Sequence, residues 1–131
     1  MYQRPPSVEA VASLKRGSVL YAAGRREVIA YNLNNGSAEV LYYNAGNFYA
    51  EGITVVGADL YFLRTQGDIM RMPKVGGTVS IYATVPKDPA APTSAVGMDL
   101  VYQQGSLYTF GSGNGSLSIY RYDMATNEWQ G

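Results

Sequence analysis

Short apolar runs separated by glycine-rich and asparagine-rich segments recur along the chain. Residues 19–23, Val-Leu-Tyr-Ala-Ala, are apolar on both faces, which is typical of a strand covered on each side. Residues 26–33 and 116–123 alternate apolar and polar positions, as half-exposed strands do. Pairs such as Asn35-Gly36 and Gly76-Gly77 between the runs suit hairpin turns, because both residues tolerate positive φ. The pattern predicts short antiparallel strands throughout.

Three units of the chain open in the same way, with a glycine followed within three residues by Leu-Tyr. The openings are Gly17-Ser-Val-Leu20-Tyr21, Gly57-Ala-Asp-Leu60-Tyr61 and Gly105-Ser-Leu107-Tyr108. The three glycines lie 40 and 48 residues apart. This spacing is close to the length of a β-propeller blade, about 40–50 residues.

Another apolar run precedes each opening, clearly at residues 48–56 and 96–103 and weakly at residues 8–14. The weak run also fits one or two helical turns. With this strand included, each unit has four antiparallel strands, which is the propeller blade. The sequence therefore predicts an all-β domain over residues 1–131 with about three blades, at residues 8–44, 48–84 and 95–131. The proline-rich segment 85–95 is interpreted as a stiff spacer outside the sheets.

The third unit is predicted to lack most of its outer strand. Val40 and Ile81 fall in the outer strands of the first two units, and their counterpart by alignment is Gly131. Three blades are also fewer than the four to eight of typical propellers. Either residues 1–4 pair there and close the ring or arc, or the chain belongs to a larger array or assembles with copies of itself. Because an uncovered blade face exposes apolar surface, we expect oligomerisation or docking.

The second half of the third unit has a recognisable set of residues: Tyr122, Asp123, Thr126 and Trp129. With these residues the unit resembles a kelch repeat. It departs from that pattern where Ser112 separates Gly111 from Gly113, since kelch repeats favour an adjacent glycine pair. The first two units match loosely, with Asn32 and Pro73 at the position of Asp123. The resemblance implies a kelch-like propeller and a binding role, and it carries over no catalytic residue.

The amino-acid composition excludes several kinds of catalytic and metal-binding site. The chain has neither cysteine nor histidine, which removes disulfides, thiolate metal sites and the commonest general base and zinc ligand. Ten basic residues balance ten acidic ones, so neither nucleic acid nor membrane insertion is expected. We therefore expect no cofactor and no metal.

The sequence predicts neither a signal peptide nor a membrane-spanning segment. Residues 1–16 lack the continuous apolar stretch of a signal peptide, and no run approaches the roughly 18 apolar residues that cross a bilayer. The expectation is a soluble protein that is cytoplasmic or virion-associated.

Acidic residues offer no obvious catalytic group. They are dispersed along the sequence, and Asp59 and Asp99 precede leucines at strand starts, where turn capping is the simplest role. A two-carboxylate glycosidase remains a remote alternative, which needs two acids within about 5–10 Å in one cleft. Residues 111–115 are interpreted as a hairpin loop, because a strand and no helix follows them.

Tyrosine is unusually frequent, with 12 tyrosines against three phenylalanines and one tryptophan. Tyr21, Tyr61 and Tyr108 share one repeat position and are assigned to packing between blades. Other aromatic residues near strand ends form the candidate interaction surface, because tyrosine supplies rigid contact area with a polar tip. These candidates are Tyr42, Tyr43, Tyr49, Tyr82, Tyr102 and Trp129. Trp129 is expected to pack under the missing strand or against a neighbouring chain.

Taken together, the sequence favours a non-catalytic interaction or structural module, whose partner is another protein or a copy of itself. A phage virion or tail component suits a small, cysteine-free and histidine-free β-protein that must dock. The alternative is a carbohydrate-binding, lectin-like propeller. Exposed aromatic residues in pockets between blades would favour the lectin, and a flat apolar face would favour the structural module.

Overall fold

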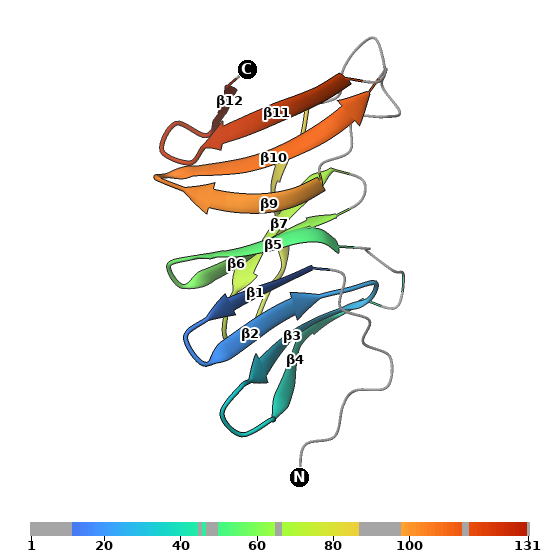
Figure 1. Cartoon of the computed structure of the whole chain (residues 1–131), viewed down its shortest axis with the longest axis vertical. Helices are drawn as coiled ribbons and strands as arrows, with labels where there is room; N and C mark the ends of the chain where they lie inside the picture. Colours follow the sequence, from blue (N-terminus) through green and yellow to red (C-terminus); the bar gives the residue numbers. More distant parts are fainter. Residues whose placement is uncertain are drawn as a thin grey trace.

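Three four-stranded antiparallel sheets make up the described part of the chain (Figure 1). The computed structural model describes residues 12–44, 46, 50–64, 67–86, 98–113 and 116–130, excluding the side chains of 12–14, 98 and 111–118. These residues form no helix, and so no helix among them is long and apolar enough to cross a membrane. The predicted class, all-β with three propeller-type blades of four antiparallel strands, is confirmed.

Consecutive strands pair within each sheet, and the sheets are called blades one, two and three. Blade one contains β1 (Ala12–Arg16), β2 (Val19–Ala23), β3 (Glu27–Asn32) and β4 (Ala38–Tyr43). Blade two contains β5 (Ala50–Val56), β6 (Asp59–Arg64), β7 (Asp68–Pro73) and β8 (Ser80–Thr84). Blade three contains β9 (Met98–Gln103), β10 (Ser106–Gly113), β11 (Ser116–Asp123) and β12 (Glu128–Gln130).

The register of the strands shows that the three blades repeat residue by residue. The Leu of each Leu-Tyr pair faces the third strand at one equivalent position: Leu20 opposite Tyr31, Leu60 opposite Met72, and Leu107 opposite Tyr122. The opening glycines lie in the turn before the second strand, with φ of 60°, 60° and 83°. Glycine adopts these left-handed conformations at little cost, which explains why it recurs there.

The hydrophobic core lies between blades rather than within one sheet. One cluster joins blades one and two, with Tyr21 and Val28 packed among Leu60, Phe62 and Met72. A second cluster joins blades two and three and is built from these residues: Tyr61, Leu63, Ile69, Val85, Leu100, Leu107 and Tyr122. Blade two is therefore covered on both faces, as strands with apolar residues on each side require.

The described parts of the inner strands begin at Ala12, Ala50 and Met98, and the expected earlier residues 8–11, 48–49 and 95–97 lie outside the described residues. Two further expectations are decided by the structure. The ambiguous run at 8–14 contributes residues 12–14 to strand β1 rather than to a helix. The glycine-rich segment assigned to a loop is partly strand, because residues 111–113 continue β10 and pair with β11.

The outer strand of blade three is short but present. β12 has three residues, whereas β4 has six and β8 has five. Trp129 pairs with Tyr122 at the position where Ala38 pairs with Tyr31 in blade one, as the alignment predicted. The predicted pairing of residues 1–4 at this edge lies outside the described residues.

Candidate functional site

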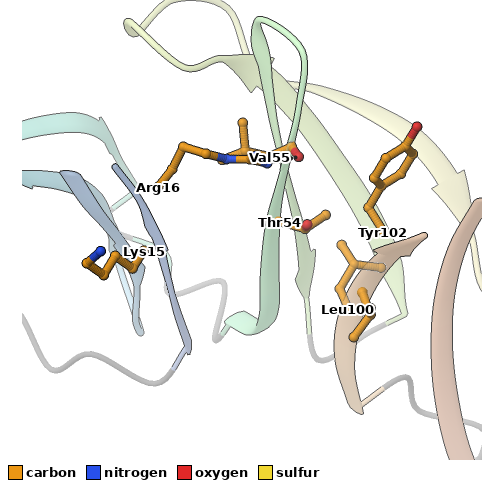
Figure 2. A pocket seen from close by; sticks show the side chains of 7 residues that line it. Lys15, Arg16, Thr54, Val55, Leu100 and Tyr102 are labelled. Atoms are coloured by element: carbon orange, nitrogen blue, oxygen red, sulfur yellow. Dashed lines mark hydrogen bonds between the residues drawn. The ribbon is translucent and has the colours of Figure 1, made fainter. Parts of the chain in front are cut away.

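The inner strands β1, β5 and β9 lie next to one another where the three blades converge (Figure 1). They enclose an open groove of about 310 Å³, called the axial groove here. The groove is lined by Lys15, Arg16, Thr54, Val55, Leu100, Val101 and Tyr102. Figure 2 shows side chains of all three inner strands around it, with Arg16 extending from β1 toward Val55 of β5. Every lining residue thus comes from an inner strand.

Residues at one equivalent position of the three blades line the axial groove. Lys15, Val55 and Tyr102 pair with the repeated leucines Leu20, Leu60 and Leu107 of their own blades. One position of the repeat therefore carries a cation in blade one, an aliphatic side chain in blade two and an aromatic ring in blade three. Arg16 adds a direct link between blades, because its Nη2 donates a hydrogen bond of 2.9 Å to the carbonyl oxygen of Val55.

The axial groove combines charged, polar and aromatic side chains. Lys15 and Arg16 supply positive charge, Thr54 supplies a hydroxyl, and Tyr102 supplies a partly exposed ring. Among the residues that the structure describes, no carboxylate lines the groove. Tyr and Arg are residue types that contribute strongly to contacts between molecules.

Two inner strands approach each other closely at Gly52. A Cβ atom placed on Gly52 of β5 would lie 2.4 Å from the backbone nitrogen of Leu100 in β9. Asp99, the residue before Leu100, has φ of 63°, and its Oδ1 accepts a hydrogen bond from the Leu100 N–H at 2.8 Å. The hydroxyl of Thr109 donates a 2.7 Å hydrogen bond to the Asp99 carbonyl oxygen, which holds this irregular start of β9 against β10.

The two aspartates assigned to turn capping have different roles. Asp99 accepts a hydrogen bond from the N–H of the next residue, Leu100, whereas a turn-capping aspartate bonds the backbone two residues on. The Oδ2 of Asp59 accepts hydrogen bonds of 3.1 and 2.9 Å from Nε and Nη2 of Arg71 on the neighbouring strand β7. This hydrogen bond to the carboxylate raises the pKa of Arg71. The interaction is a cross-strand ion pair, a role of Asp59 that was not predicted from the sequence.

A second hollow, also of about 310 Å³, lies on the side of blade three that faces away from blade two. Four apolar residues define this surface, called the blade-three end face: Val101, Tyr108, Phe110 and Ile119. Ile119 is 68% exposed and Val101 is 50% exposed. Large apolar side chains that gather at one exposed site commonly mark an interaction surface.

The blade-three end face occupies repeat positions that are buried in the other blades. Ile119 pairs with Phe110, as Ile69 pairs with Leu63 and Val28 pairs with Ala23. Ile69 and Val28 are both 0% exposed, since the next blade covers them. Val101, Phe110 and Ile119 were not among the predicted interaction residues, which were the tyrosines and the tryptophan near strand ends. The alignment of the third strands, which matches Ile119 with Val28 and Ile69, is the signal that could have identified Ile119.

The predicted interaction residues do not form one surface. Tyr43 is 54% exposed on β4 of blade one, and Tyr102 lines the axial groove, so these two lie at separate places. Tyr42 packs against the core between blades one and two, with its ring centroid 6.1 Å from that of Phe62. Tyr49 lies outside the described residues. Binding by Tyr43 and Tyr102 stays a prediction.

Tyr82 and Trp129 belong to an aromatic ladder that joins blades two and three. Tyr82 contacts Tyr61 and Tyr122 in edge-on geometry, with centroid distances of 5.0 and 5.4 Å. Trp129, which itself belongs to the outer strand β12, contacts Tyr122 edge-on at 5.0 Å. Packing of Trp129 against a neighbouring chain stays a prediction. Burial raises the pKa of both Tyr61 and Tyr82. Tyr61 and Tyr82, which form the ladder together with Tyr122 and Trp129, are therefore neutral at physiological pH.

The predicted packing role of the repeated tyrosines holds for two of the three. Tyr21 and Tyr61 are buried between blades, whereas Tyr108 is half-buried on the blade-three end face. Tyr108 thus has the position of an inter-blade residue without a covering blade among the described residues.

Each of the three hollows described here, formed by the described residues, is lined by at most one acidic residue. Asp99 is the one acid at the blade-three hollow, and Glu39 is the one acid at a third hollow on blade one. No group of three or more potential metal ligands occurs among these residues either. The two-carboxylate glycosidase therefore gains no support from these pockets.

No protein-family model matches the sequence, and no curated protein matches it. Among solved structures, the chain is similar to the computationally designed Ika8 protein, with a TM-score of 0.58 and 10% identity. The match covers 92% of this chain and 35% of that one, so the chain spans about a third of the length of Ika8. At this identity the likeness is one of fold alone.

Two further structures score lower. The N-terminal domain of Nup159 has a TM-score of 0.46 and 12% identity over 85% of this chain and 30% of that one. The computationally designed Ika4 protein has a TM-score of 0.44 and 8% identity over 91% of this chain and 94% of that one. Neither similarity adds to the account of the fold given by the sheets themselves.

Proposed function

We propose that this chain is a non-catalytic structural module that docks through its blade-three end face into a larger assembly, such as a phage virion or tail. The observation that supports the proposal is Ile119. This residue is 68% exposed, although both equivalent residues, Val28 and Ile69, are 0% exposed under the next blade. A side chain built for an inter-blade core here faces solvent, and covering it stabilises whatever complex covers it.

The surroundings of Ile119 agree with docking. Tyr108 and Phe110 are half-buried beside it, and Val101 continues the apolar surface toward the axial groove. A tyrosine and a phenylalanine among aliphatic residues are typical of the centre of a protein interface, where charged residues are depleted. The single acid at its edge, Asp99, already accepts a backbone hydrogen bond.

The experiment compares association of the unmodified chain with that of Ile119→Lys by sedimentation velocity at micromolar concentrations. We expect the unmodified chain to associate and Ile119→Lys to weaken association by about tenfold or more, since a lysine would be desolvated at the centre of the contact. Circular dichroism and Trp129 fluorescence establish that the variant is folded.

Val75→Lys is the matched control, because Val75 is 79% exposed in the turn after β7, away from the blade-three end face. It introduces the same charge and should leave association unchanged. An unmodified chain that stays a compact, stable monomer at these concentrations would contradict the proposal. Association that Ile119→Lys and Val75→Lys affect equally would contradict it as well.

A lectin-like role is the second candidate, and Tyr102 is the observation that favours it. Its ring is 37% exposed and lines the axial groove, to which Thr54 and Lys15 also contribute polar groups, and an exposed tyrosine ring can stack on a sugar. Titration of the unmodified chain with monosaccharides, followed by shifts of tyrosine NMR resonances, separates the two candidates. A saturable shift at Tyr102 without any self-association favours the lectin.

A further inference from the structure

The interfaces within the chain point to the partner of the blade-three end face. This inference rests on the proposed function and names the partner. We propose that the occupant is blade one of a second copy of this chain, and that two copies close head to tail into a six-bladed ring.

Each interface within the chain uses one face of a blade and the opposite face of the next. The face turned toward the following blade carries the pair Ala23–Val28 in blade one and Leu63–Ile69 in blade two. Blade three presents the same pair as Phe110–Ile119, on its end face. A blade packed there would continue an arrangement that the chain already uses twice.

The face turned toward the preceding blade is equally regular. It carries the pair Leu60–Met72 in blade two and Leu107–Tyr122 in blade three, and all four residues are buried. Blade one has Leu20 opposite Tyr31 at this position.

On blade one the face is only partly covered. Leu20 and Tyr31 are half-buried, whereas Ala22 and Ile29 on the same face are buried. Leu20 and Tyr31 are the more exposed residues of this face and are together called the blade-one end face. Its chemistry matches what covers Ile69 within the chain, where Leu107 and Tyr122 occupy the same core cluster.

The two end faces are complementary to each other and not to themselves. The blade-three end face is the face that a following blade covers, and the blade-one end face is the face that packs on a preceding blade. A contact of this kind is heterologous, and heterologous contacts form closed rings when the rotation allows. Two copies supply six blades, within the four to eight of typical propellers, whereas three copies would supply nine.

The ring would also complete the axial groove. Lys15, Val55 and Tyr102 are equivalent residues on three adjacent inner strands. A second copy placed head to tail adds the same three residues on the opposite side of the axis. The groove then becomes a channel whose lining belongs to both copies.

A pair of variants tests the head-to-tail arrangement. Leu20→Glu blocks the blade-one end face and leaves blade three intact, whereas Ile119→Lys blocks the blade-three end face and leaves blade one intact. Each variant alone should be monomeric at concentrations where the unmodified chain has the mass of two chains. An equimolar mixture should recover the two-chain mass in native mass spectrometry, because one natural contact is available between the different variants.

Each alternative arrangement gives another result. Two-chain particles of Leu20→Glu alone would show that blade-three end faces pair with each other, and two-chain particles of Ile119→Lys alone would show the same for blade one. A mixture that stays monomeric, or an unmodified chain with the mass of three or more chains, also overturns the ring. Tyr31→Glu replaces Leu20→Glu if the latter does not fold by circular dichroism.

Failure of the ring and failure of the proposed function are distinguishable. If the unmodified chain associates and Ile119→Lys prevents this while Leu20→Glu does not, the docking face stands and the head-to-tail ring is wrong. If Ile119→Lys has no effect on association, the docking face itself is wrong.

Discussion

At the scale of single residues, Gly52 controls how closely blades two and three approach. No side chain separates β5 from β9 at this point, and an added Cβ would overlap the backbone of both Asp99 and Leu100, at 2.5 and 2.4 Å. Backbone atoms within strands cannot move aside as a flexible side chain does. The convergence of the inner strands, and with it the axial groove, depends on this glycine.

Gly52→Ala should therefore lower the free energy of unfolding by about 1–3 kcal/mol, as overpacking of a core does. Denaturant unfolding monitored by Trp129 fluorescence measures the change, because Trp129 packs on the core shared by blades two and three. The native emission spectrum should also shift as the two blades separate.

Gly17→Ala provides the contrast for this experiment. A Cβ at Gly17 meets nothing within 4 Å, so the cost is that of its φ of 60° alone. It should destabilise the chain without altering the native Trp129 spectrum. A Gly52→Ala chain with unchanged stability and spectrum would show that β5 and β9 are not in such close contact.

At the scale of elements, the aromatic ladder gives the interface between blades two and three a dependence on pH. Burial is the first cause of the raised pKa of both Tyr61 and Tyr82. The pKa of Tyr82 is raised further by charge repulsion from Tyr61 and Tyr122. A pKa raised in the folded state means that the folded chain binds more protons than the unfolded chain. The corresponding stability is complete below pH of about 10 and is lost as the pH rises through the folded-state values.

Thermal unfolding measured from neutral pH to above pH 10 should show this alkaline loss, with pH 10 being the approximate pKa of an unfolded tyrosine. Tyr82→Phe keeps the ring and removes one of the two shifted hydroxyls, so the loss should become smaller. Tyr43→Phe, at an exposed position on β4, is the control. Equal alkaline losses in Tyr82→Phe and the unmodified chain would refute the assignment.

The elements also show what a sequence can and cannot predict here. The repeated Leu-Tyr pairs identified the blades, because strand period and glycine turns are local properties that three units share. The partner of Asp59 was not predictable in this way. Its contact with Arg71 depends on the cross-strand register, which brings together residues 12 positions apart in the sequence.

Trp129 illustrates the same limit. Its alignment with Ala38 was correct, but the alignment places a residue on a strand without saying which neighbour fills the space around it. The neighbour of Trp129 is Tyr122 of the aromatic ladder. The blade-three end face was not predicted from the sequence for a related reason. The exposure of its residues depends on whether another blade covers them and not on the residue type.

At the scale of the whole molecule, the three blades differ in how many faces are covered. Blade two is packed on both sides, and Leu60, Phe62, Leu63 and Ile69 of β6 and β7 are all 0% exposed. Blade three has one covered face and one end face with exposed Ile119. In repeat proteins, stability is approximately the sum of the stabilities of single repeats and of their interfaces. The middle blade should therefore be the most stable part of the chain.

Hydrogen exchange of a chain held monomeric by dilution tests this gradient. The amides of β6 and β7 should exchange most slowly and those of β10 and β11 faster, because a blade with one interface opens at a lower free energy than a blade with two. At concentrations where the chain associates, β10 and β11 should become as protected as β6 and β7, while β7 itself changes little. Uniform protection of all three blades in the monomer would mean that the molecule opens only as one unit. In that case the exposed end face would not lower the free energy of opening of blade three. Covering that face would then stabilise blade three by less than the repeat arrangement implies.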